Sequence, residues 1–92
     1  MSKNKTFTWD EPKRQINIEK HGIDFQDAKH IFEDPYRIER QSYKNYEDRY
    51  EVIGEVNSNI LLVAYVIREG NVYRLISARR ASRNERKSYY EI

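Results

Sequence analysis

Arginine side chains gather near the end of this 92-residue chain, where their spacing is suited to holding a phosphate. Six of the seven basic residues in positions 56–92 lie between Arg74 and Lys87. A guanidinium group presents a planar fork of donors that matches phosphate oxygens. Arg79 and Arg80 directly precede a predicted helix, whose free N–H groups also favour an anion. The pattern predicts phosphate binding there, and the alternative is an ordinary solvated basic surface.

Lys20 and His21 are the candidates for proton transfer. Both lie at the end of the first predicted helix. Histidine titrates in the range where a catalytic group can both take and give a proton. The structural alternative is equally balanced, because a histidine at this position can interact with the last helix carbonyls, and Lys20 can be a solvated lysine.

Arg49, Glu85 and Tyr89 also have both a functional and a structural interpretation. Arg49 can simply pair with the acidic residues at 47–48. Glu85 stands three residues after Ser82, which is the spacing of a helix capping box, and we favour that role over catalysis. Tyr89 is more typical of a core or rim position than of a catalyst.

Several classes of site are not indicated by the sequence. There is no phosphate-binding Walker loop, glycine-rich dinucleotide turn or nucleophile elbow. The two histidines, His21 and His30, are nine residues apart, and the acidic residues form no compact group, so we expect neither a metal nor a cofactor. The chain has no cysteine, and its longest apolar run, Ile60–Ile67, is too short to cross a membrane. We expect a cytoplasmic protein.

The first half of the chain predicts one strand and two helices. Residues 5–9 alternate as a short strand does. A helix follows from the cap at Asp10 to His21, with Gly22 in the left-handed position after it. A second helix begins at Asp24 and ends at the Asp-Pro pair at 34–35. Its apolar face consists of Phe25, Ala28, Ile31 and Phe32.

The second half predicts four strands and a final helix. We expect an edge strand over 36–41, a loop over 42–48, and strands over 49–56, 60–67 and 72–79. The run 60–67 is continuously apolar, as is typical of a central strand. The last helix begins at Ser82. The predicted order is β-α-α-β-β-β-β-α in a single domain over residues 1–92. The fold class is α+β, with the first two helices covering one face of an antiparallel meander.

The chain resembles the BrnT family of toxins over nearly its whole length, from Phe7 to Tyr89. The matching segments follow the family pattern in order. They are 7–10, 17–22, 25–28, 31–32, 34–35, 48–49, Gly54, 74–79, Ala81, 85–86 and Tyr89. One departure is Asp48, where the family commonly has glutamate.

This resemblance implies a compact RelE/ParE-like fold and a ribonuclease that blocks translation. It implies a BrnA-type antitoxin as partner, a heterotetramer of two toxins and two antitoxins, and operator DNA bound only through the antitoxin. Relatives of this fold often cleave RNA with lysine, arginine and tyrosine, using the RNA 2′-hydroxyl as nucleophile and no metal.

Together, the residues and the resemblance give a site hypothesis. We expect the catalytic residues to be Lys20, His21, Arg49, Arg79 and Glu85. We expect Arg74, Arg80, Arg86 and Tyr89 to bind or orient the RNA. Two alternatives stay open, because a fold does not fix a function. One is a module that binds nucleic acid or a protein partner without catalysis, and the other is a ParE-like toxin directed at gyrase.

Overall fold

The computed structural model describes residues 5–44 and 46–91. The strands are β1 (Thr6–Thr8), β2 (Ile38–Lys44), β3 (Glu47–Val56), β4 (Asn59–Arg68) and β5 (Val72–Arg80). The helices are α1 (Glu11–His21), α2 (Phe25–Ala28) and α3 (Arg83–Tyr90), with a 3₁₀ helix, η1 (Lys29–Glu33), directly after α2. The α+β class predicted from the sequence is confirmed.

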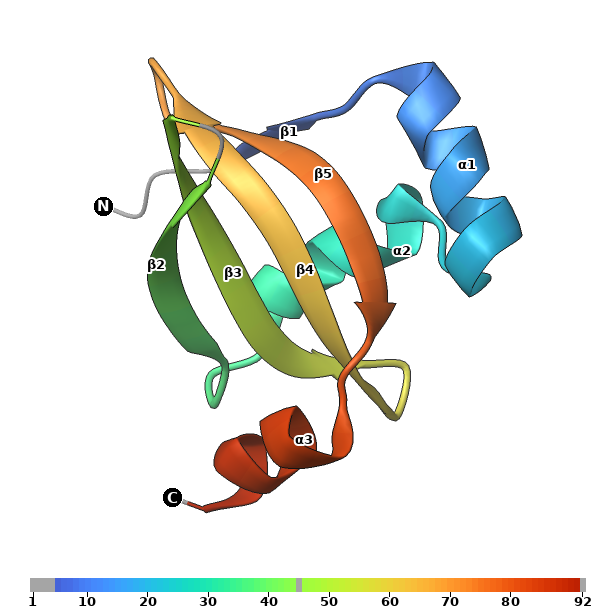
Figure 1. Ribbon diagram of the computed structural model, residues 1–92, viewed down its shortest axis with the longest axis vertical. Coiled ribbons are helices and arrows are strands. Elements are labelled where there is room, and N and C mark those ends of the chain that lie inside the picture. The colour runs from blue at the N-terminus through green and yellow to red at the C-terminus, as the bar shows by residue number, and fades with distance from the viewer. Residues whose placement is uncertain (1–4, 45, 92) are drawn as a thin grey trace.

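The strands form one sheet in the order β1-β5-β4-β3-β2 (Figure 1). The four strands β2 to β5 form the antiparallel meander expected from their short connections. β1 joins the other side of β5 in parallel, so the sheet is mixed rather than purely antiparallel. The apolar strand β4 lies at the centre of the sheet, in agreement with its continuous hydrophobic sequence.

The predicted loop over residues 42–48 is wrong, because strands occupy most of it. β2 continues to Lys44 and β3 already begins at Glu47. The hairpin has few apolar residues, so its alternation is hidden in the sequence. Toward the turn its cross-strand pairs are mostly polar, including Arg40 opposite Glu51 and Ser42 opposite Arg49. Opposite charges facing each other across two strands stabilise this end of the hairpin, while Val52 and Ile53 farther along β3 are buried in the protein core.

The helix boundaries follow the expected local signals, except that the Asp10 side chain makes no capping hydrogen bond at the start of α1. Asp10 and Gly22 flank α1, and Gly22 has the left-handed φ of 70°. The Asp24 side chain accepts a hydrogen bond from the Gln26 N–H at the start of α2. The second predicted helix changes to 3₁₀ geometry after Ala28, which differs from the single α-helix expected. Such tightening is common at helix ends.

The main core lies between the sheet and the α2–η1 segment, which crosses behind the sheet in Figure 1. All four apolar residues expected on that helical face are buried, and Ile31 meets β3 at Gly54. A Cβ at Gly54 would lie 2.8 Å from Cγ1 of Ile31, closer than atoms can pack. Glycine at this position therefore lets the helix approach the sheet.

Helix α1 packs beside β5 rather than over the sheet, where β1 no longer covers the strand (Figure 1). The buried side chain of Asn17 takes the place of a neighbouring strand there. Its amide donates to the Ala78 carbonyl at 2.9 Å, and its oxygen accepts from the Ala78 N–H at 3.1 Å. This pairing fixes the face of α1 that carries Lys20 and His21 next to β5.

Helix α3 packs on the opposite face of the sheet from α2 and η1. A second, smaller core lies beneath it, formed by Ile53, Ile60, Leu62, Ala81 and Tyr89. No helix among the described residues is long and apolar enough to cross a membrane.

Candidate functional site

The site lies on the sheet face opposite α2 and η1, next to α3. Alternate residues of the strands point to this face. They surround a hollow of about 240 Å³ lined by Ser42, Arg49, Glu51, Leu62, Ala64, Ser77 and Arg79. We call this surface, together with Arg40, Arg74 and Glu85 at its border, the arginine face. It brings together predicted site residues from β3, β5 and α3.

Arg79 is held in the hollow by Glu85. Its Nη1 and Nη2 atoms donate to the two carboxylate oxygens of Glu85 at 2.8 and 2.9 Å. The same carboxylate accepts from the Ser82 N–H at 2.7 Å, which completes the predicted capping box. The Arg79 hydrogen bonds hold the pKa of Glu85 down at about 2, and Glu85 in turn raises the pKa of Arg79. Glu85 is thus a cap and a fixed partner for Arg79.

Arg40 and Glu51 belong to this site and were missed in the sequence. The Arg40 Nε donates to Glu51 at 2.8 Å, and its Nη2 lies 3.8 Å from Glu85. The signal that could have found them is the period of two in β2 and β3. It places Arg40 and Ser42 across from Glu51 and Arg49 once the hairpin is recognised.

Arg49 and Arg74 are the less constrained cations of this face. Arg49 forms a long contact of 3.4 Å with Glu47, which is the structural pairing anticipated for it, and it also lines the hollow. Arg74 opposes Val66, which follows Leu62 and Ala64 at a period of two and therefore shares their face. Within the described part of the chain, Arg74 has no ion-pair partner.

Lys20 and His21 lie in a neighbouring hollow between α1 and β5. Both side chains are exposed, and Ser77 of β5 lines both this hollow and that of the arginine face. The structure therefore places the predicted proton-transfer candidates on the other side of Ser77 from Arg49 and Arg79, in adjoining hollows rather than in one.

The expected pairing of Arg79 with Arg80 at one phosphate is wrong. Consecutive residues of a strand point to opposite faces, so Arg80 points away from Arg79. Its Nη1 donates to the Asn59 side chain at 2.8 Å, and it lines a separate hollow that also includes Asp27 of α2. At the helix N-terminus beside them, the Ser82 N–H donates to the Glu85 side chain and the Glu85 N–H to the Ser82 side chain.

Tyr89 and Arg86 hold α3 in place. The Tyr89 ring is 6% exposed, and its hydroxyl donates to Oδ2 of Asp34 at 2.6 Å. Burial is the largest cause that raises the pKa of Tyr89, and the hydrogen bond to Asp34 is the second. Arg86 donates to the Ala81 carbonyl at 2.9 Å. Neither side chain lines the hollow of the arginine face, so the RNA contact predicted for them has no support in this geometry.

Comparison with known proteins agrees with the resemblance of the sequence. The family model for the ribonuclease toxin BrnT of type II toxin–antitoxin systems matches residues 9–85. The chain belongs to the BrnT family. It is also similar to the crystal structure of the Brucella abortus ribonuclease toxin BrnT, with 32% identity and a TM-score of 0.66. That match covers 87% of this chain and all of the Brucella chain. Among curated proteins, no match was found.

BrnT membership identifies the chain as a ribonuclease toxin of a type II toxin–antitoxin system, and therefore as a protein with an antitoxin partner.

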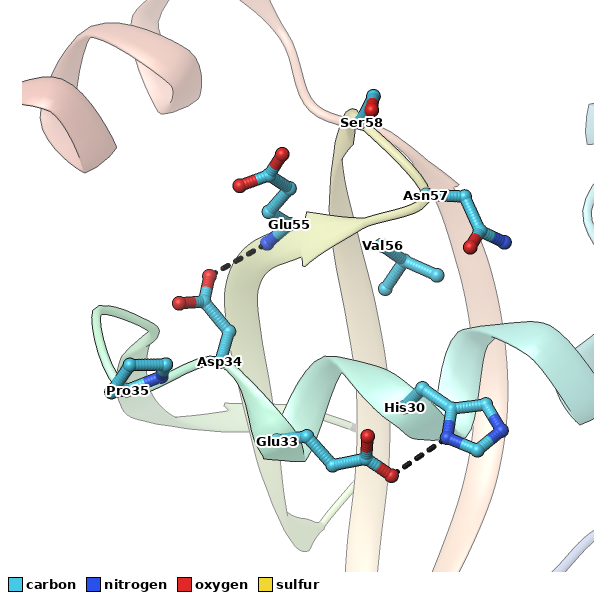
Figure 2. A pocket seen from close by; sticks show the side chains of 8 residues that line it. All are labelled: His30, Glu33, Asp34, Pro35, Glu55, Val56, Asn57 and Ser58. Atoms are coloured by element: carbon cyan, nitrogen blue, oxygen red, sulfur yellow. Dashed lines mark hydrogen bonds and ion pairs between the residues drawn. The ribbon is translucent and has the colours of Figure 1, made fainter.

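A larger hollow of about 520 Å³ lies elsewhere, between η1 and the β3–β4 turn (Figure 2). None of the predicted site residues lines it. His30 there is paired with Glu33 at 2.7 Å, while Asp34 accepts from the Glu55 N–H. Among the residues that the structure describes, no three histidine or acidic side chains form a metal-binding group.

Proposed function

We propose that this BrnT-family chain is a metal-independent endoribonuclease whose active site is the arginine face. The observation that carries the proposal is the Arg79 side chain, which is fixed by Glu85 and opens onto a hollow shared with Arg49. A preorganised cation beside a hollow is what a reaction at a phosphate requires, because negative charge accumulates on the phosphate oxygens in the transition state.

Arg79 has donors left for a phosphate after its structural contacts. A guanidinium group has five N–H groups, and Arg79 donates three hydrogen bonds, two to Glu85 and one to the Arg80 carbonyl. The remaining N–H groups can donate to a phosphate oxygen in the hollow. Arg49 supplies a second cation from β3 and Arg74 a third from β5, while Glu85 keeps the Arg79 guanidinium in a single orientation.

The reaction itself needs a base and an acid. A base removes the proton of the RNA 2′-hydroxyl, whose oxygen then attacks the adjacent phosphorus. The bond from phosphorus to the 5′-oxygen breaks, and an acid protonates that oxygen, leaving a 2′,3′-cyclic phosphate and a 5′-hydroxyl. Arginine stays protonated and is suited to neither role. His21 or Lys20 is our preferred proton-transfer group, reaching the phosphate across Ser77.

The family membership supports several finer proposals about biology. We infer that RNA cleavage inhibits translation, and that a BrnA-type antitoxin neutralises this chain in a complex of two toxins and two antitoxins. Operator DNA would be bound by the antitoxin and not by this chain. The relation of the fold to RelE and ParE toxins remains a prediction.

The test is RNA cleavage by the purified chain in the presence of EDTA. Arg79→Ala should reduce the cleavage rate about 10²- to 10³-fold, as expected for the loss of a transition-state donor. Arg80→Ala is the matched control, because the same charge is removed from the adjacent position on the other side of the sheet. It should cleave RNA at nearly the wild-type rate.

Two outcomes would contradict the proposal. Intact RNA after incubation with the folded wild-type chain would point to a binding module or to another target, such as gyrase. Equal losses in Arg79→Ala and Arg80→Ala would mean that the arginine face is not the active site.

A further inference from the structure

Only some of the residues that line the hollow between α1 and β5 have a role in the proposed reaction. Its volume is about 240 Å³, and it is lined by Lys13, Ile16, Asn17, Lys20, His21, Ile76 and Ser77. We call it the helix groove. Lys20 or His21 transfers a proton in the proposed reaction. Lys13, Ile16 and Ile76 have no part in that chemistry.

Lys13, Ile16 and Lys20 follow one another along a single face of α1, at helical spacings of three and four residues. Ile16 is 57% exposed, although it is large and apolar. The lysines are exposed, and within the described residues neither takes part in an ion pair. The helix groove thus presents an accessible apolar side chain between two cations that no carboxylate neutralises.

This order of groups matches a single strand of RNA, in which apolar base faces alternate with phosphates. Lys13 and Lys20 are separated by seven residues, or about 10 Å along the helix at 1.5 Å per residue. Their flexible stems leave room for a nucleoside to lie over Ile16 while each ammonium group contacts a phosphate.

The helix groove is also continuous with the arginine face. Ser77 of β5 has a small side chain and lines both hollows, so they adjoin at this residue. Asn17 fixes the spacing, because its side chain bonds to Ala78 and holds α1 against the strand next to Ser77. An RNA strand with one phosphate bound at Arg79 can therefore continue across Ser77 into the helix groove.

We infer that the helix groove is a second RNA subsite, which holds a nucleotide flanking the cleaved phosphate through Lys13 and Ile16. This inference rests on the proposed function for the location of the cleaved phosphate. The occupant we assign is single-stranded RNA and not the antitoxin, because the groove shares a wall with the proposed active site and carries positive charge.

The experiment measures binding of a labelled short single-stranded RNA, with every variant made in the Arg79→Ala background to suppress cleavage. Affinity is recorded between about 50 and 200 mM salt, since each phosphate contact contributes about −0.7 to the slope of log K against log salt. Lys13→Ala should make that slope shallower by about 0.7. Ile16→Ala should weaken binding about fivefold or less without changing the slope, because it removes only apolar contact.

Arg68→Ala is the control for charge, because Arg68 is an exposed cation at the far end of β4 and lines neither hollow. It should leave the slope unchanged. All the substituted groove side chains are exposed, and circular dichroism would verify that each variant is folded.

An unchanged slope in Lys13→Ala, or an equal change in Arg68→Ala, would overturn the RNA subsite. If Lys13→Ala instead weakened binding to the antitoxin alone, the groove would be a protein-docking surface and our inference would be wrong. The proposed nuclease activity can fail independently of the subsite. If the wild-type chain bound RNA, the variants showed the predicted slopes and no RNA was cut, the nuclease proposal would be wrong and the RNA subsite would stand.

Discussion

The two faces of the sheet use neighbouring residues of the same strands for different purposes. On β5, Ala78 is fully buried against α2 and η1, while the next residue, Arg79, opens onto the arginine face. On β3, the same alternation separates buried Val52 from Glu51. The first face carries the main apolar core, whereas the second combines ion pairs around a hollow with the smaller core beneath α3.

Residues that stabilise the fold and residues that are proposed to act on RNA are therefore neighbours in the sequence. The alternation of side chains along a strand places them on opposite faces of the sheet. A substitution on the core face should change the free energy of unfolding and spare cleavage in the molecules that remain folded. A substitution of a polar side chain that lines the hollow should reduce cleavage and change the free energy of unfolding much less. Substitutions on the two faces test that separation, and the largest effect on stability is expected in the main core.

Leu75→Ala should lower the free energy of unfolding by about 2–5 kcal/mol, since Leu75 is 1% exposed in the main core and truncation leaves a cavity. Urea denaturation measures the change. Ser77→Ala, two residues along the same strand and in the hollow, is the control and should stay within about 0.5 kcal/mol of the wild type. Equal losses in the two variants would mean that the faces do not differ in their contribution to stability.

Asn17→Ala should cost about 1–3 kcal/mol, because it leaves the Ala78 N–H and carbonyl without their buried partners. This substitution connects the two functions, since Asn17 also positions the helix groove. We expect RNA cleavage by the folded variant to fall as well. Gln15→Ala, at an exposed position of the same helix, should alter neither quantity. A stable Asn17→Ala variant would show that other contacts hold α1 on β5.

Acid should weaken the Arg79–Glu85 pair in a defined range of pH. The pKa of Glu85 is lowered from 4.5 to about 2, so its stabilising effect is complete above about pH 4.5 and is lost as the pH falls toward 2. Arg79 is partly exposed, and solvent screening limits the contribution to about 1 kcal/mol.

The comparison of wild type with Glu85→Gln isolates this contribution. Arg14 also holds the pKa of Asp24 down at about 2. The stability that is lost when Asp24 is protonated is the same in both proteins. The difference in unfolding free energy between them should therefore shrink as the pH falls from about 5 to 2. A difference that stays constant over that range would contradict the assigned pair.

Much of the fold was predictable because its signals are local. The caps at Asp24 and Ser82, the left-handed Gly22 and the apolar run of β4 each lie within a few residues of the structure they specify. The parallel pairing of β1 with β5 was not predictable, because it joins residues that are far apart in the chain and leaves no local pattern.

The site was predictable only in part, for the same reason. Arg49, Arg79 and Glu85 were expected and do lie on one face, but Arg40 and Glu51 depend on a hairpin register that polar residues conceal. Strand alternation alone separates Arg79 from Arg80, but their position before a helix N-terminus favours the competing prediction that both hold one phosphate. The role of Tyr89 depends on Asp34, which is 55 residues away and cannot be found by spacing.

Tyr89→Phe is the smallest of the predicted changes and the most direct test of that last assignment. The substitution keeps the buried ring and removes the hydroxyl that donates to Asp34, which still accepts from the Glu55 and Tyr36 N–H groups. We expect a loss of about 1 kcal/mol in the free energy of unfolding and little change in cleavage. Tyr90→Phe, at a neighbouring side chain that is 70% exposed, should change neither. If Tyr89→Phe kept its stability but lost cleavage, the hydroxyl would act on the RNA, and α3 would belong to the active site as well as to the scaffold that supports it.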